Sequence, residues 1–452
     1  MQVSAVGNSL VTLCWKANTE TDLKGYNISY KPASGEWKTL FTANTTYTIE
    51  SLNNNVLYSF KAAAVNQDDL SSPDSTEVTA TPSTDVSAQV ALLGAPFTKG
   101  TYARNVWDMQ SLDGKIYLGH GDAASDAGPI PILYLDSDSG QFVQQYTAAE
   151  EQVDVYKILD GRLTAPGMDA TESWNYGNFY TLDGGNWDKH RTIPIATHVY
   201  DIASYNGKIY AAVESQSHDA SLPPDIALTA SSDGGKTWTS QMPKSSSLPF
   251  GSGSCIGRTL FEFNGKLYCI GTLTPGYVTT NNNNVLVTDG TTATIQKMAN
   301  LLPGGKQYYS HRILRPTTIG GSLLYLGVIN CNGCEWDPDG LFKASDLNRA
   351  SKVSLPESQA LPTDILARGT TAYVLAYIPQ ANNKFANIVY KSDDLNTWTE
   401  LFRFTSDAFA RSFEEMNGDF YFGLGCNTST KPASTGNILK VPQSVYKASL
   451  AS

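Results

Sequence analysis

Four carboxylates lie in segments where acid–base chemistry on a sugar would be feasible. Asp122, Asp169 and Glu214 each follow a short apolar run, and Asp337 lies in a polar loop. Glycosidic cleavage uses two carboxyl groups beside the scissile bond, about 5–5.5 Å apart for retention and about 6.5–9.5 Å apart for inversion. If the chain is a hydrolase, these four residues are the catalytic candidates. The alternative is that they bond loop backbones and one another.

A second group of loop residues could hold a ligand without transforming it. Aromatic side chains offer flat faces on which sugar rings stack, and polar side chains bond hydroxyl groups. The predicted ligand-binding residues are His120, Asp122, Trp174, Tyr308, Tyr309, Arg312 and Trp336. An aromatic loop residue can equally fill a gap in packing, so that alternative stays open.

A repeated hairpin must position these loops. Short apolar runs flank a turn glycine at seven places, namely Gly114, Gly161, Gly207, Gly265, Gly321, Gly369 and Gly418. Most of these turns are Asn-Gly, Asp-Gly or Gly-Gly, which accept the positive φ angles of a tight β-hairpin. Successive glycines are 47, 46, 58, 56, 48 and 49 residues apart, close to the roughly 40–50 residues of one four-stranded propeller blade. We therefore predict a seven-bladed β-propeller over residues 86–452.

A second motif lies in phase with the hairpins. Residues 231–238 match the Asp-box pattern Ser-x-Asp-x-Gly-x-Thr-Trp, in which side-chain oxygens bond turn amides and the tryptophan plugs the turn. Degenerate copies lie at Asp183 with Trp187 and at Asp394 with Trp398. The predicted structural residues of these turns are Ser231, Asp233, Gly235, Trp238, Asp183, Trp187, Asp394 and Trp398.

This motif resembles the hairpin between the third and fourth strands in sialidase-like Asp-box (BNR) propellers. The resemblance implies a turn on the face opposite the ligand site, and it implies architecture more than sialidase chemistry. A sialidase would need an arginine cluster, for which Arg104, Arg258 and Arg312 are available. However, sialidases resemble six-bladed propellers, and their Phe/Tyr-Arg-Ile-Pro motif is not matched at Arg191-Thr-Ile-Pro194.

The first 85 residues read as a separate unit. Val11, Leu13 and Trp15 alternate, as do Tyr26, Ile28 and Tyr30, and such period-two runs at short intervals indicate a β-sandwich. With Leu52 six residues before Tyr58, as in a tyrosine corner, the segment resembles a fibronectin type III module. The predicted fold is all-β, with a fibronectin III-like β-sandwich at 1–85 followed by the propeller.

Composition excludes several classes of function. A net charge of −11 argues against nucleic-acid binding, which needs a basic face. No run of 18 apolar residues is present, so we expect no membrane insertion. The Cys331-x-x-Cys334 pair has no second pair nearby, so we expect no metal and no cofactor. Homo-oligomerisation is left open.

Fibronectin-like and Asp-box propeller modules usually work outside cells, yet the N-terminal residues show no signal-peptide pattern. Bacteriophage virion components satisfy both conditions because they leave the host by lysis, and the 119–129 loop loosely resembles those of phage tail or fibre propellers. We predict a non-catalytic attachment protein, virion or extracellular, that binds cell-surface glycan or an envelope receptor through the propeller and other virion proteins through the N-terminal module. The alternatives are an extracellular, sialidase-like glycoside hydrolase and a structural virion scaffold or decoration protein.

Overall fold

The computed structural model describes residues 1–215, 226–243, 256–273, 284–298, 300–306, 310–331 and 334–447. Over these residues the regular structure is β-strand apart from four short 3-10 helices, η1 (Ser87–Gln89), η2 (Tyr102–Arg104), η3 (Ala381–Asn383) and η4 (Gln443–Val445). The predicted all-β class is confirmed. No helix among the described residues is long and apolar enough to cross a membrane.

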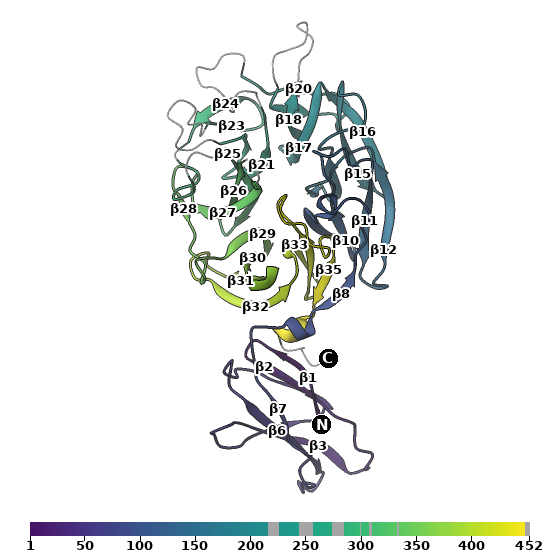
Figure 1. The fold of residues 1–452 in the computed structure, drawn as a ribbon, viewed down its shortest axis with the longest axis vertical. Helices are drawn as coiled ribbons and strands as arrows, with labels where there is room; N and C mark the ends of the chain where they lie inside the picture. The colour runs from purple at the N-terminus through teal and green to yellow at the C-terminus, as the bar shows by residue number, and fades with distance from the viewer. Residues whose placement is uncertain are drawn as a thin grey trace.

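The N-terminal part is a sandwich of two antiparallel sheets (Figure 1). One sheet contains β1 (Gln2–Gly7), β2 (Leu10–Cys14) and β5 (Thr46–Ile49), and the other contains β4 (Lys38–Thr42), β3 (Leu23–Pro32), β6 (Tyr58–Asn66) and β7 (Val78–Ala80). The alternating residues Val11, Leu13 and Ile28 are fully buried between the sheets, as their period-two pattern requires. The Tyr58 hydroxyl accepts a hydrogen bond of 3.1 Å from the Asn53 amide, the local contact expected of a tyrosine corner.

Within the described residues, the chain after β7 forms seven four-stranded antiparallel sheets. In the order first to last strand they are sheet 1, β9 (Asp108–Leu112), β10 (Lys115–Gly119), β11 (Ile130–Asp136) and β12 (Phe142–Ala148); sheet 2, β13 (Lys157–Leu159), β14 (Arg162–Pro166), β15 (Tyr176–Asp183) and β16 (Asn186–Pro194); sheet 3, β17 (Ala196–Tyr205), β18 (Lys208–Ser215), β19 (Leu228–Ser231) and β20 (Thr239–Ser240); sheet 4, β21 (Thr259–Phe263), β22 (Lys266–Ile270), β23 (Asn284–Thr288) and β24 (Ala293–Lys297); sheet 5, β25 (Ser310–Ile319), β26 (Ser322–Cys331), β27 (Cys334–Ala344) and β28 (Ala350–Lys352); sheet 6, β29 (Leu361–Arg368), β30 (Thr371–Pro379), β31 (Phe385–Ser392) and β32 (Thr399–Ser406); and sheet 7, β33 (Phe409–Met416), β34 (Asp419–Gly425), β35 (Ile438–Val441) and β8 (Ala91–Gly94).

Each of the seven predicted hairpins joins the first and second strands of one sheet. The turn glycines all have positive φ, and in six of the turns the preceding residue does too, as at Asn206 (φ 49°) and Gly207 (φ 72°). This is the backbone of a type I′ turn, for which Asn-Gly and Asp-Gly are suited.

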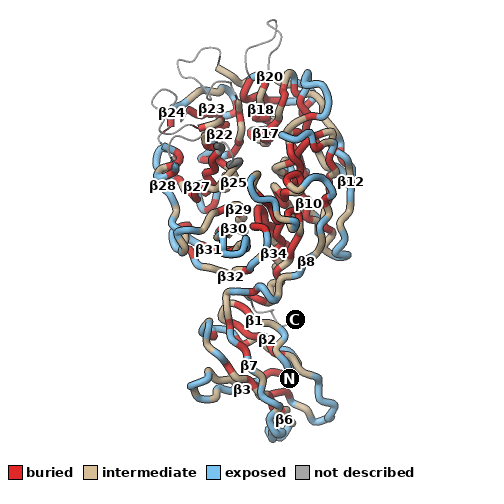
Figure 2. The backbone as a smooth tube through the Cα atoms, in the orientation of Figure 1, coloured by how far each residue is buried: buried red, intermediate tan, exposed pale blue. Residues whose placement is uncertain are grey.

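The apolar core lies between consecutive sheets. Buried clusters fill the space between sheets 1 and 2, 2 and 3, and so on to sheets 7 and 1. Met109 and Ile116 of sheet 1, for example, pack against Met416 of sheet 7. Figure 2 shows the buried backbone running through the sheets, with exposed residues mainly at peripheral loops and turns.

The Asp-box octet forms the turn that its pattern predicts. Asp233 Oδ1 accepts hydrogen bonds from the Lys236 and Thr237 amides at 3.0 and 2.9 Å, and Ser231 Oγ accepts one from Gly235 at 2.8 Å. Asp394 bonds the amides of Asn396 and Thr397 in the same way, at 2.8 and 2.7 Å. The tryptophans of the three predicted turns pack as plugs; Trp187 and Trp398 are buried, and Trp238 donates to the Gly235 carbonyl at 3.1 Å. Asp183 instead ends β15 beside a two-residue turn.

The segment after the N-terminal sandwich forms backbone hydrogen bonds with the seven-sheet part, and so does the sandwich itself. Thr84 and Val86 exchange backbone hydrogen bonds with Arg403 of sheet 6 at 2.7 and 2.9 Å. A few residues later, β8 pairs with β35 as the outer strand of sheet 7. The Asn8 amide of the sandwich donates to the carbonyl of Val445, the last residue of η4, at 3.0 Å. Segment 84–94 therefore connects the edges of two sheets that lie more than 300 residues further along the chain.

Candidate functional site

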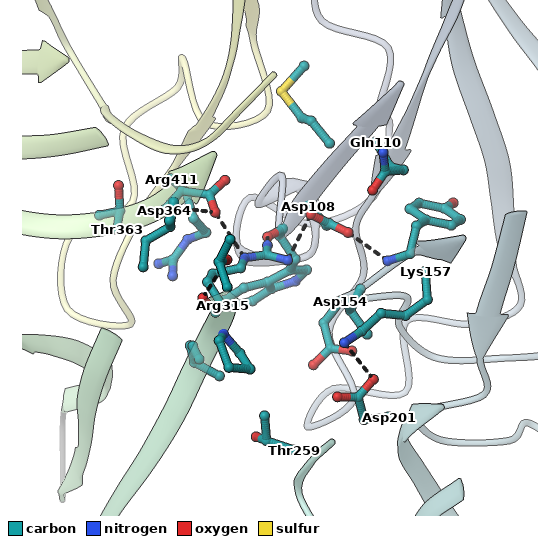
Figure 3. Close-up of a pocket in the computed structure, with 18 of the residues that line it drawn as sticks. Asp108, Gln110, Asp154, Lys157, Asp201, Thr259, Arg315, Thr363, Asp364 and Arg411 are labelled. Carbon is teal, nitrogen blue, oxygen red and sulfur yellow. Dashed lines mark hydrogen bonds and ion pairs between the residues drawn. The ribbon is translucent and has the colours of Figure 1, made fainter. Parts of the chain in front are cut away.

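A cavity of about 400 Å³ lies at the centre of the seven sheets (Figure 3). Residues in or beside the first strand of every sheet line it, including Asp108, Asp154, Tyr200, Asp201, Arg258, Thr259, Arg312, Arg315, Thr363, Asp364, Arg411 and Glu414. This volume is within the range of small-ligand sites, which are mostly apolar with a few convergent polar groups. Here the polar groups are unusually numerous.

Arg315 connects two buried carboxylates inside the cavity. Its Nη1 lies 2.8 Å from Asp108 and its Nε lies 3.0 Å from Asp364, and Figure 3 shows the guanidinium between them. Burial alone would lower the pKa of Arg315, but the two aspartates raise it above the ordinary arginine value. Arg315 therefore stays charged and joins sheets 1, 5 and 6.

Inner-strand side chains also hydrogen-bond the next sheet along the chain. The carboxylates of Asp108, Asp201 and Asp364 accept from the amides of Tyr156, Leu260 and Phe413 at 2.6, 2.8 and 3.1 Å. The hydroxyls of Thr259 and Ser412 donate to the carbonyls of Ile313 and Val106, both at 2.8 Å. The Val199 amide donates to the Gly167 carbonyl at 3.0 Å. With the Arg315 pairs, every sheet is bonded to the next, and the seventh to the first.

One-residue bulges aim several side chains into this cavity. The pairing register shifts across Tyr200 in β17, Thr363 in β29 and Arg411 in β33, and across Arg315 in β25. Arg315 adopts a φ of 52° and Trp336, in the irregular part of β27, a φ of 57°. Such backbone costs roughly 1–3 kcal/mol for a bulky residue and concentrates at functional sites. Bulges serve there to redirect a side chain.

Four residues that line the cavity and Glu214, which bonds one of them, form what we call the arginine–aromatic cluster: Tyr200, Glu214, Arg258, Arg312 and Trp336. The Tyr200 hydroxyl donates to Glu214 at 2.7 Å, and Arg258 lies 3.9 Å above the Tyr200 ring. Arg312 stacks 3.4 Å from the Trp336 ring centre and 5.5 Å from that of Tyr200. Two guanidinium groups thus share one aromatic ring.

The cluster lies at the end of the sheets opposite the Asp-box turn. In sheet 3, Glu214 pairs with His198 at one end of the hairpin, whereas Ser231 pairs with Ile209 near the other end. Arg258 precedes β21 and Arg312 lies near the start of β25, the same end of their own sheets.

Burial shifts the pKa values of several charged residues that line the cavity. Burial raises the pKa of Asp364 to about 7, although Arg315 opposes the shift. Burial likewise raises the pKa of Asp154 to about 6. Burial, together with Arg258, lowers the pKa of Arg312 to about 9. At neutral pH, Arg312 therefore still carries charge.

Two predicted ligand residues, His120 and Asp122, are buried and bonded within the protein. His120 is buried, bonds the Pro131 carbonyl at 2.9 Å and stacks on Phe97, and burial lowers its pKa to about 4. Asp122 is buried and caps its own loop, accepting from the Ala124 amide at 3.1 Å and the Ser125 hydroxyl at 2.6 Å. Both side chains thus have partners inside the protein, and their roles as ligand or hydrolase residues stay predictions.

The other predicted residues are spread over several sheets. Glu214, Arg312 and Trp336 come together in the cluster. Asp169 lies 3.8 Å from His198 of the adjacent sheet, and burial raises its pKa. Asp337 has a raised pKa for the same reason and a buried Oδ1 with no partner among the described residues. Trp174 is half exposed, in a loop that Arg191 holds through Ser173. Tyr308 and Tyr309, and the side chains of Cys331 and Cys334, lie outside the described residues.

Sequence reasoning missed the inner carboxylates and two of the residues on bulges, Tyr200 and Thr363. A signal for the former exists, because Asp108, Asp201, Thr259 and Arg315 each lie six residues before a hairpin glycine. The recurrence of polar residues at this position of an otherwise apolar strand marks the cavity wall. Tyr200 leaves no such signal.

Glu150 gives a prediction about pH. Its side chain is fully buried, its Oε1 accepts from Asn178 at 2.6 Å and Tyr180 at 2.9 Å, and burial raises its pKa from 4.5 to about 7. The folded protein therefore holds this proton more tightly than the unfolded chain, so stability is full below about pH 4.5 and falls as pH rises toward 7. We expect Glu150→Gln to reduce the fall in unfolding free energy between pH 5 and 8 by about 2 kcal/mol, measured by chemical denaturation. Exposed Glu36→Gln should leave the pH profile unchanged; an unchanged profile in Glu150→Gln would contradict the assignment.

Comparison with solved structures finds similar folds at low identity. The β-propeller domain of the Trilobed protease from Pyrococcus furiosus has a TM-score of 0.44 at 7% identity, covering 76% of this chain and 99% of that chain. An auxiliary nutrient binding protein from Bacteroides ovatus has a TM-score of 0.41 at 11% identity, covering 96% and 94%. Polysaccharide lyase Uly1 has a TM-score of 0.41 at 10% identity, covering 77% and 91%.

Among curated protein sequences, none matches this chain significantly. The fibronectin type III family model matches residues 1–81, the segment that forms the two-sheet sandwich. The N-terminal part is therefore a fibronectin type III domain.

Proposed function

We propose that this chain is a carbohydrate-recognition protein in which the seven sheets act as the blades of one β-propeller. The ligand would bind at the central cavity, with sugar rings against Trp336 and Tyr200 and hydroxyl or charged groups on Arg258, Arg312 and Glu214. The observation that carries the proposal is the convergence of two arginines and two aromatic rings within stacking distance of one another. Protein sites for sugars combine flat apolar faces with charged or amide groups in this way.

The proposal extends to the setting of the protein. We propose that it is an attachment component, either of a bacteriophage virion or of another extracellular assembly, and that the fibronectin type III domain docks it to other proteins of that assembly. Capsid and tail genes beside its gene would support the virion setting. Polysaccharide-utilisation genes there would favour an enzyme instead.

A glycan array probed with the full chain tests recognition. Trp336→Ala removes a stacking face and the support of Arg312, so we expect at least about a tenfold loss of affinity for the retained glycan. Trp37→Ala is the matched control, because Trp37 also lies beneath cations, Lys31 and Lys61, but belongs to the fibronectin type III domain. If the full chain binds no glycan on the array and no purified host envelope, recognition is excluded.

Sialidase-like hydrolysis is the second candidate, favoured by the hydrogen bond between Tyr200 and Glu214, a pair that could act as nucleophile and base. Against it, burial raises the pKa of Tyr200 above the ordinary value for tyrosine, and a protonated phenol is a weak nucleophile. Recognition therefore ranks first. Release of reducing ends from any retained glycan, lost in Glu214→Gln, would reverse that order.

A further inference from the structure

We infer that the arginine–aromatic cluster binds an oxyanion carried by a sugar, a carboxylate or a sulfate ester, through Arg258 and Arg312. This inference rests on the proposed function and names the class of glycan that the site selects. It predicts that the protein discriminates acidic from neutral glycans, although the chain itself has a net charge of −11.

The first step is the balance of charge in the cavity. Three of the six cations that line it have close carboxylate partners: Arg315 pairs with Asp108 and Asp364, Lys157 with Asp201 at 3.2 Å, and Arg368 with Glu414. Arg258 has only Glu214, at 3.8 Å. Among the described side chains, no carboxylate forms an ion pair with Arg312. Arg258 and Arg312 therefore lack a close ion-pair partner, although the buried Asp154 lies near enough to Arg312 to raise its pKa.

The second step is the state of the guanidinium groups. The Nε atoms of Arg258 and Arg312 are both buried and have no hydrogen-bond partner among the described residues. A buried charged donor without a partner is costly, and charge-assisted bonds to an oxyanion would offset that cost. Burial and mutual repulsion lower the pKa of Arg312, and a bound anion would relieve the repulsion.

The third step is orientation. A guanidinium that stacks flat on an aromatic ring points its N–H groups sideways, parallel to the ring. There they can form two hydrogen bonds to one oxyanion. Arg312 lies at stacking distance from Trp336, and Arg258 lies at stacking distance from Tyr200. Glu214 accepts the Tyr200 hydroxyl and lies 3.8 Å from Arg258, too far for a direct hydrogen bond to the guanidinium. Two guanidinium groups held beside aromatic rings suit an anionic group attached to a sugar.

Arg411 does not belong to this pair. It is buried, its Nε donates to Asn105 at 2.9 Å and its Nη2 to the Cys426 carbonyl at 2.8 Å. These bonds satisfy it within the protein, so it serves as a contrast to Arg258 and Arg312.

The test is a glycan array that pairs uronate-, sialate- and sulfate-bearing glycans with their carboxyl-reduced or desulfated counterparts, probed with the full chain. We expect retention of acidic members only, weakening as NaCl is raised. In Arg258→Gln/Arg312→Gln, we expect each lost arginine to reduce affinity roughly ten- to hundredfold. The matched control is Arg162→Gln/Arg349→Gln, which removes the same charge from side chains that are 60% and 79% exposed. Carboxyl reduction and desulfation identify which oxyanion is bound.

The outcomes separate the two proposals. Equal binding of acidic glycans and their neutral counterparts, or loss of binding in the control double variant to the same extent, overturns the oxyanion inference but leaves recognition standing. Binding to no glycan overturns both. To exclude misfolding as the cause of lost binding, the single variants Arg258→Lys and Arg312→Lys, which keep the charge, should retain salt-dependent binding weaker than wild type, and all variants should unfold at the wild-type midpoint.

Discussion

Replacing Arg315 with methionine is expected to lower the free energy of unfolding by roughly 3–5 kcal/mol, because it leaves a buried carboxylate pair without its cation. Asp108 and Asp364 are only 6% and 3% exposed, and Arg315 is the residue that ion-pairs with both. Methionine keeps an unbranched side chain but lacks the guanidinium, so the loss reports mainly the missing charge and its ion pairs. Chemical denaturation with far-UV circular dichroism measures it.

The same variant should become more sensitive to pH. Burial already raises the pKa of Asp364 to about 7, and loss of Arg315 removes the main opposing influence. A carboxyl whose pKa is raised on folding stabilises the folded state below its unfolded pKa, and that stability is lost as pH rises. The destabilisation should therefore be larger at pH 8 than at pH 5.

Two further variants test whether the lost ion pairs cause the destabilisation. Arg349→Met removes a cation that is 79% exposed and should change stability by less than about 1 kcal/mol. The triple variant Arg315→Met/Asp108→Asn/Asp364→Asn should recover part of the loss, since it removes the stranded charges together with their partner. If Arg315→Met behaves like Arg349→Met, the ion network does not hold the sheets.

The hairpins were predictable because their signal is local. Asn206-Gly207 and the six equivalent turns need positive φ, which few residues other than glycine and asparagine tolerate, so sequence and backbone conformation correspond almost directly. The Asp-box turn is local for the same reason, because Ser231, Asp233 and Gly235 bond within five residues.

The site was less predictable because the burial of a side chain and the pairing register of its strand depend on tertiary contacts. His120 and Asp122 were assigned correctly to the end of a strand and its loop, but the sequence does not tell that Phe97, from a segment before the strand, covers His120. Tyr200 faces the cavity only because one extra residue interrupts the pairing of β17 with β18. Nothing in the residue types around Tyr200 signals that bulge.

Removing residues 1–96 is expected to abolish cooperative folding of the seven sheets, whereas removing residues 1–83 is not. Both truncated chains lack the fibronectin type III domain, and they differ only in segment 84–96. That segment contributes β8, the outer strand of sheet 7, and Val86, which is fully buried against Phe402 and Phe404 of sheet 6.

The expected loss of stability follows from the contacts that segment 84–96 makes. Burying Val86 contributes roughly 1.5–3 kcal/mol, and the backbone bonds to Arg403 and β35 contribute about 0.5–1.5 kcal/mol each. Their sum approaches the roughly 5–15 kcal/mol that stabilises a whole domain. Without β8, β35 also becomes an exposed edge that can pair with another chain.

Circular dichroism melting and size-exclusion chromatography measure the outcome. The chain that begins at residue 84 should melt in one sharp transition as a soluble species, and the chain that begins at residue 97 should melt far lower or aggregate. A synthetic peptide of residues 84–96 added during refolding should restore the transition, because an open sheet edge accepts a strand in trans. If the two chains melt alike, β8 is dispensable, and the apolar clusters between the sheets, including the one between sheets 7 and 1, must hold them together without it.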